Sequence, residues 1–305
     1  MRCYFSQQSW IVLLLSGLML LAPAQADENV LADLEKAKQE LTQTKYLLQY
    51  KFQSGEKLTY DIEQLVTIDT TIAGNRQQTQ LRTQSNRSFD VQAVAADGNM
   101  QFAHTINRVN MWSEVSGRAP VHFDTADNKP APPEFERVGD NVGKPISVIT
   151  IDPAGNIVNR QDKIQHPDLG LGGLTIPLPA EEIAPGHQWA EPMELKVQLE
   201  DKRIQSVKIR ELFELVKVET GVATISVKTQ VLTPIDDPRV QSQLIQRISK
   251  GEIRFDVDSG RILSRQLDWD EQVLGFSGAD SNMKYLQRLT ETLVPATQTA
   301  ALPQR

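Results

Sequence analysis

The residue types that most often carry out chemistry in proteins are few and widely spaced in this sequence. The sequence has four histidines, which are His104, His122, His166 and His187. No two of them are at the close spacing typical of metal ligands. Neither a His-Glu-x-x-His nor a His-x-His sequence occurs. The favoured interpretation is that each is an ordinary polar residue. We therefore predict no catalytic, cofactor-binding or metal-binding residues and no cofactor.

Paired carboxylates occur at Glu181-Glu182, at Asp236-Asp237 and in the run Asp268-Trp269-Asp270-Glu271. The run is the most suggestive, because an aromatic ring between acids can line a sugar site. In a strand, however, Asp268 and Asp270 would share one face and Trp269 would point to the other. This pattern favours a half-buried strand with an acidic outer face and a tryptophan in the core.

The signals for nucleophilic and phosphate chemistry are weak. No Gly-x-Ser-x-Gly sequence occurs, and Ser277 lacks that spacing. The glycine-rich stretch 170–173 has no Lys-Ser/Thr after it, so it is better interpreted as a connector than as a phosphate loop. A hydrolase remains open if two or more of these side chains meet in one cleft: His104, His122, Asp268 and Asp270.

The N-terminus has the features of a cleavable signal peptide. Arg2 supplies a positive charge, residues 10–21 form an uninterrupted apolar run, and Ala24-Gln25-Ala26 matches the cleavage pattern. A membrane-spanning helix needs about 20 apolar residues, so this run is short for an anchor, although an uncleaved anchor is the alternative. The sequence predicts cleavage after Ala26 and a periplasmic or secreted protein that begins at Asp27.

Composition narrows the class of protein further. The single cysteine, Cys3, precedes the apolar run, so the mature chain would have no disulfide or thiol chemistry. The net charge of −7 becomes −8 without Arg2, and no basic stripe is present for nucleic acid. No second apolar run approaches membrane length, which predicts that the mature chain has no transmembrane segment.

Hydrophobic residues alternate with polar ones along most of the chain. The alternation begins at Tyr46, Leu48, Tyr50 and Phe52, and it recurs in long runs separated by glycine turns such as Asp97-Gly98. This period predicts a mainly β (α+β) fold, built as long antiparallel curved sheets or a half-barrel. A period of 3.6 residues predicts helices at 27–43 and 240–248, whereas 282–294 is assigned to a strand.

Changes in period and composition divide the chain into six parts. They are a signal peptide (1–26), an amphipathic helix (27–43), a first β-rich half (44–169), a connector (170–180), a second β-rich half (181–294) and a disordered tail (295–305). Within the first half, the proline-rich stretch 124–140 is predicted to be a mobile loop, because prolines exclude it from a central strand.

The two β-rich halves share a short motif. Residues 155–161 and 260–266 have glycine, isoleucine, arginine and glutamine in register, each after an Asp-containing turn. A duplication would make each segment the second strand of a hairpin, with Ile157 and Ile262 facing a core and Arg160 and Arg265 on the opposite face. Chance resemblance between two β-rich halves is the alternative.

Several further segments resemble an uncharacterised family of exported, β-rich proteins common in planctomycete-type bacteria. They are Tyr50–Gly55–Tyr60, Met111-Trp112, Phe123-Asp124-Thr125, Gly143-Lys144-Pro145 and Pro185-Gly186-His187-Gln188-Trp189. The resemblance covers most of the mature chain and implies no catalytic residue. The expected architecture is also similar to the half-barrel of bacterial lipoprotein carriers, a family that holds acyl chains on a concave apolar face.

These observations favour a noncatalytic envelope protein whose curved sheet holds a lipid-like ligand or docks an envelope protein. A purely structural or assembly module is the first alternative, and a hydrolase assembled only in the fold is the second. An apolar cavity of several hundred Å³ would favour ligand binding over the structural alternative.

Overall fold

The computed structural model describes residues 44–164, 174–199 and 202–295. The predicted signal peptide, the predicted helix at 27–43, His166 and the glycine-rich stretch 170–173 lie outside these residues, as does almost all of the predicted tail. Among the described residues, no helix combines the length and the apolar character needed to cross a membrane.

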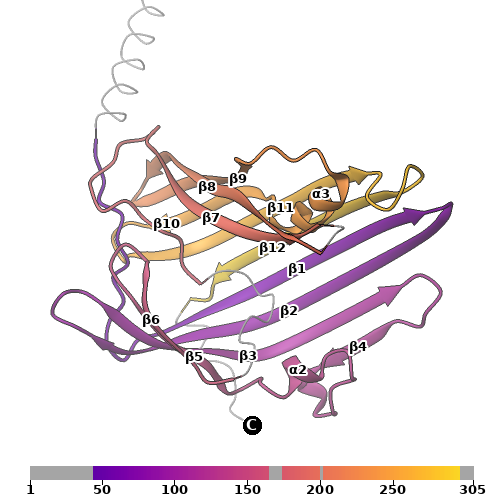
Figure 1. Cartoon of the computed structure of the whole chain (residues 1–305). Coiled ribbons are helices and arrows are strands. Elements are labelled where there is room, and N and C mark those ends of the chain that lie inside the picture. Colours follow the sequence, from indigo (N-terminus) through magenta and orange to yellow (C-terminus); the bar gives the residue numbers. More distant parts are fainter. Residues whose placement is uncertain (1–43, 165–173, 200–201, 296–305) are drawn as a thin grey trace, which may run out of the picture. The chain divides into compact units, whose positions relative to one another are not determined.

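One open antiparallel sheet dominates the described chain (Figure 1). Its strands are β1 (Lys57–Ile72), β2 (Asn75–Val94), β3 (Met100–Val115), β4 (Val121–Asp124), β5 (Pro145–Ile151), β6 (Ile157–Asp162), β7 (Gln188–Gln198), β8 (Ile204–Glu219), β9 (Val222–Val231), β10 (Lys250–Asp256), β11 (Arg261–Leu274) and β12 (Asn282–Leu293). The spatial order is β6-β5-β3-β2-β1-β12-β11-β10-β9-β8-β7, with β4 paired to β3. The predicted fold class is confirmed.

The chain traces the sheet outward from its middle and then back. From β1 it runs strand by strand to β6 at one edge, and the next strand in sequence, β7, forms the opposite edge. The remaining strands return to β12, which pairs with β1 from Tyr60↔Leu293 to Thr71↔Asn282. Strands β6 and β7 are therefore consecutive in sequence but lie at opposite edges of the sheet.

The two faces of the sheet differ in composition, as strand alternation requires. On β1, Leu58, Tyr60 and Ile62 are buried on what we call the inner face, whereas Asp61 and Glu63 lie on the outer face. The outer face carries exposed ion pairs such as Glu63–Arg82, at 2.9 Å. Burial of each large apolar side chain contributes about 1.5–3 kcal/mol, so the inner face supplies most of the folding free energy.

The segment 44–53 packs against the inner face instead of joining the sheet. It has only an isolated bridge, Tyr46↔Ile183, so the predicted strand over these residues is wrong. Its alternation still places Tyr50 and Phe52 inward, where Tyr50 contacts Phe255 of β10 and Phe52 contacts Phe102 of β3. These two rings therefore join distant strands into one core, which requires the sheet to curve around them.

Both predicted hairpins form, but a β-bulge in each changes which side chains lie on the inner face. In β5–β6 and in β10–β11 the register shifts one residue after the motif isoleucine, Ile157 or Ile262. A β-bulge moves the residues after it to the other face of the strand. Arg265 is therefore buried on the inner face with Ile262, and the prediction that it lies opposite is wrong.

The two motif isoleucines also differ in burial. Ile262 is 2% exposed, whereas Ile157 is 50% exposed. The prediction that both face a core is wrong for Ile157, because β6 is an edge strand and all of its residues are exposed. The bulge that both hairpins share agrees with a duplication, whereas the exposure of Ile157 does not. The duplication therefore stays a prediction.

The predicted helix at 240–248 is confirmed as α3 (Pro238–Leu244) followed by the 3-10 turn η2 (Ile245–Arg247). Asp237 caps α3, because its carboxylate accepts a hydrogen bond from the backbone N–H of Arg239 at 2.9 Å. Pro238 occupies the first turn, where its missing N–H has no cost. The strand assigned to 282–294 is confirmed as β12.

The proline-rich stretch is not a mobile excursion. It contains a 3-10 turn, η1 (Thr125–Asp127), and a short helix, α2 (Glu136–Gly139). Phe135 is 7% exposed and stacks on Phe123 of β4, with ring centroids 6.5 Å apart. This buried aromatic pair anchors the stretch to the inner-face residues Ile106 and Val109.

Candidate ligand-binding site

The helix α3 and the turn η2 lie over the inner face of the second half. Val240 and Leu244 pack with Val207 and Ile209 of β8, while Ile245 packs with Val273 of β11. The unit α3–η2 thus reaches from near one edge of the sheet to its middle. An amphipathic helix on a sheet face buries apolar surface of both elements.

Polar side chains hold α3–η2 in place at both ends. Gln243 accepts a hydrogen bond from the backbone N–H of Gln198 at 2.9 Å and donates one to its carbonyl at 2.7 Å. At the other end, Trp269 Nε1 donates to the carbonyl of Gln246 at 3.1 Å. These bonds fix one end of α3–η2 to the end of β7 and the other end to β11.

A pocket of about 410 Å³ opens between α3–η2, the end of β9 and β11. Its lining is mostly apolar, and the lining residues are Val231, Leu232, Thr233, Pro234, Ile235, Gln241, Leu244, Ile245, Ile248, Glu271, Gln272 and Val273. This volume falls within the range of small-molecule sites, about 300–1,000 Å³, and an apolar wall with few polar groups is typical of them.

Exposed apolar side chains mark the rim of this pocket. Val231 and Leu232 are 39% and 50% exposed. The segment 231–235 is held to α3 by Gln241, whose amide nitrogen donates to the carbonyl of Ile235 at 3.0 Å. Apolar groups held in water beside an apolar cavity favour a ligand that covers them.

Glu271 is the titratable side chain of the pocket lining. It lies on the inner face of β11, opposite Tyr285 of β12. Among the described residues, its carboxylate makes no hydrogen bond or ion pair. Burial and then the neighbouring Asp270 raise the pKa of Glu271, and Lys250 opposes them. The pocket therefore combines mostly apolar walls with one carboxylate.

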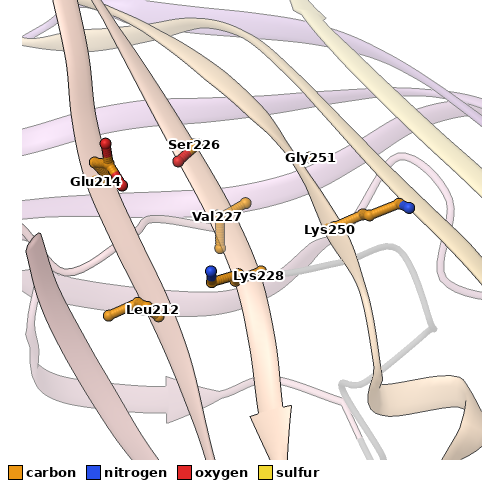
Figure 2. A pocket seen from close by; sticks show the side chains of 7 residues that line it. All are labelled: Leu212, Glu214, Ser226, Val227, Lys228, Lys250 and Gly251. Atoms are coloured by element: carbon orange, nitrogen blue, oxygen red, sulfur yellow. The ribbon is translucent and has the colours of Figure 1, made fainter.

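A second hollow, of about 350 Å³, lies on the outer face over β8, β9 and β10 (Figure 2). Lys228 and Lys250 are directly paired across β9 and β10, next to Glu214 of β8. In Figure 2 the ammonium groups of the two lysines extend in opposite directions. Because these charges do not converge, this hollow is the weaker candidate.

The inner face also buries a charged cluster in its core. Arg87 of β2 and Arg265 of β11 both donate to Glu291 of β12, the second at 2.5 Å. The exposed fraction is 0% for Arg87, 4% for Arg265 and 1% for Glu291. Burial by itself raises the pKa of Glu291, but the two guanidinium groups outweigh it and hold that pKa below its usual value. The cluster ties three strands together and is closed to a ligand.

His104 is buried on the inner face near this cluster. Its ring packs edge-on against Phe89 at 5.7 Å, and Nε2 has no hydrogen-bond partner among the described residues. Burial, with smaller effects from Arg87 and Arg160, lowers the pKa of His104 to about 3. The imidazole is therefore neutral over the physiological range.

We expect the free energy of unfolding to fall by about 2 kcal/mol between pH 6.5 and pH 4.5 because of His104 alone. The unfolded histidine titrates near 6.5 and the folded one near 3, so the unfolded state binds the proton first. Denaturant unfolding at several pH values should show a shallower fall for His104→Gln. The exposed His122, changed to Gln, is the control, and equal slopes for all three proteins would contradict the assignment.

The other residues considered from the sequence do not converge. Asp268 pairs with Arg288 on the outer face, at 2.6 Å, and Trp269 lies on the inner face, as predicted. His122 Nε2 is 3.1 Å from Asn110 Oδ1 on β3, far in the strand order from β11. In the described part of the chain, no group of three His, Cys, Asp or Glu side chains is placed to hold a metal ion.

Sequence reasoning missed both the pocket and the buried cluster. Glu271 was grouped with Asp268 and Asp270, although its odd position relative to them places it on the inner face. Arg265 could have been found by one signal, a charged residue within an otherwise apolar alternation. The pocket had no local signal, because its walls come from β9, α3 and β11.

No family model and no curated protein matches this chain. Among solved structures, it is similar to one of lipovitellin described for its lipid–protein interactions, with 12% identity over 80% of this chain and a TM-score of 0.42. The translocator domain of the autotransporter NalP from Neisseria meningitidis follows, with 8% identity, 88% of this chain, 97% of that chain and a TM-score of 0.28. The match spans only 26% of the lipovitellin chain. At this level the comparisons indicate a β-rich similarity and nothing finer.

Proposed function

We propose that this protein is an exported, noncatalytic protein of the cell envelope that holds one apolar, lipid-like chain beneath α3–η2. The observation that carries this proposal is the apolar pocket of about 410 Å³ against the inner face, with Val231 and Leu232 exposed at its rim. The signal-peptide pattern before Asp27 supports export.

The first test is native mass spectrometry of protein recovered from its own host. We expect an added mass that is lost after extraction with organic solvent, because a chain buried in an apolar pocket is retained in water and released into solvent. A preparation that carries no added mass and takes up no apolar probe would contradict the proposal.

A second test locates the site. N-phenyl-1-naphthylamine, an uncharged apolar probe, should fluoresce on binding, and Ile248→Trp should weaken its binding about tenfold or more by filling the pocket. Leu65→Trp, at a 42% exposed position on the outer face of β1, is the matched control. If Ile248→Trp and the milder Ile248→Phe both bind like the unchanged protein, the pocket is not the site.

An assembly module is the second candidate, and β6 favours it, because it is an edge strand of the sheet in the described part of the chain. Ile157 and Val158 are 50% and 57% exposed on this strand. A strand of another protein can add to such an edge through backbone hydrogen bonds. A protein partner in place of an apolar molecule in the native mass spectrum would favour this candidate.

A further inference from the structure

We infer that the pocket beneath α3–η2 prefers an apolar ligand whose polar end donates a hydrogen bond, such as an alcohol, an amide or an amine, over one that ends in a carboxylate or a phosphate. This inference rests on the proposed function and specifies the chemical class of the ligand. It follows from the charges and hydrogen-bonding groups that the lining presents.

The first reason is the unused acceptor. Glu271 lines the pocket with its carboxylate unbonded within the described residues, beside the apolar side chains of Ile245 and Val273. A ligand that covers the pocket removes this half-buried carboxylate from water, which costs free energy unless the ligand supplies a hydrogen-bond donor. A ligand with a hydroxyl, amide or ammonium group supplies that donor.

The second reason is the sign of the surrounding charge. Asp270 adjoins Glu271 and, after burial, is the group that raises the pKa of Glu271, although Lys250 opposes it. An anionic end group at Glu271 would therefore meet one carboxylate directly and have a second beside it.

The third reason is that the lining contains no cation to offset this charge. No lysine or arginine is among the residues that line the pocket. Lys250 acts on Glu271 only from the outer face, where it lies opposite Asp268 in the strand register. Arg239 and Arg247 of α3–η2 are exposed and outside the lining. The two side-chain amide nitrogens of the lining already donate elsewhere: Gln241 to the carbonyl of Ile235 and Gln272 to Asn282 Oδ1.

Three probes of equal chain length test the inference: dodecanol, dodecylamine and dodecanoate, each in competition with N-phenyl-1-naphthylamine at pH 8. We expect dodecanol and dodecylamine to displace the dye at concentrations at least about tenfold below those needed for dodecanoate. Glu271→Gln removes the negative charge that repels a carboxylate and attracts an ammonium group. It should therefore bring dodecanoate to within about threefold of dodecanol and weaken the binding of dodecylamine.

The control is Glu252→Gln, which makes the same change in net charge on the outer face of β10. It should leave the order of the three probes unchanged. Dodecanoate binding as tightly as dodecanol, or an equal effect of the two variants, would overturn the inference while leaving the pocket as a binding site. If none of the probes displaces the dye, or the dye itself does not bind, the proposed function fails and the inference with it.

Discussion

Replacement of Glu291 by glutamine is expected to destabilise the protein by about 3–5 kcal/mol. The change removes a carboxylate that bonds to both Arg87 and Arg265, and the two buried guanidinium groups then face a neutral amide at that position. A buried charge that loses an oppositely charged neighbour retains the cost of leaving water without the attraction that offset it. Urea unfolding followed by circular dichroism measures the effect.

Glu63→Gln is the matched control for this prediction. It removes the same charge from an exposed pair with Arg82, and exposed pairs contribute about 0–1 kcal/mol. If Glu291→Gln does not fold, Glu291→Asp keeps the charge and should show a smaller loss of stability. Equal destabilisation by Glu291→Gln and Glu63→Gln would contradict a structural role for the buried cluster.

A single methyl group at Gly260 is expected to destabilise the protein by about 2–4 kcal/mol. In Gly260→Ala the new Cβ would lie 2.5 Å from the carbonyl oxygen of Gln49 and 2.5 Å from the nitrogen of Lys51, at φ +61°. The nitrogen of Lys51 donates to the Gly260 carbonyl at 3.0 Å, so the clash also breaks this contact. Segment 44–53, which carries Tyr50 and Phe52, would have to move.

Gly117→Ala separates the clash from the backbone strain. Gly117 has φ +79° but nothing within 4 Å of an added Cβ, so only the strain of about 1–2 kcal/mol applies. Gly155→Ala should resemble Gly260→Ala, because its Cβ would meet the carbonyl of Ile176 and the ring of Tyr50, each at 2.5 Å. If Gly260→Ala unfolds at the same urea concentration as Gly117→Ala, the segment does not depend on this close approach.

Local patterns in the sequence predicted most of the strands and, for several of them, which side chains face the core. The alternation from Leu58 to Ile62 predicts which β1 side chains are buried, and the period change at Val240 predicts α3. The same reasoning placed Trp269 inward and Asp268 outward. It failed for Tyr46 to Phe52, where the alternation is real but the segment crosses the inner face without strand partners.

The candidate site was much less predictable. The carboxylate of Glu271 belongs to a run of acids, and nothing in that run shows that one member lines a cavity. The bulge after Ile262 placed Arg265 on the inner face instead of the expected outer face. An inserted residue shifts the inward–outward alternation of every residue that follows it in the strand. Neither α3 above the sheet nor the segment 231–235 beside it has a sequence signal for the space between them.

The sequence by itself determined the alternation of the strands, the turns between them, the capped helix and the export pattern, because each depends on residues within a few positions of one another. Only the tertiary structure decided that β12 pairs with β1, which brings Glu291 to Arg87 across 204 positions of the chain. It also decided the curvature around Tyr50 and Phe52 and the pocket beneath α3. These features depend on long-range register and packing, which a local pattern does not encode.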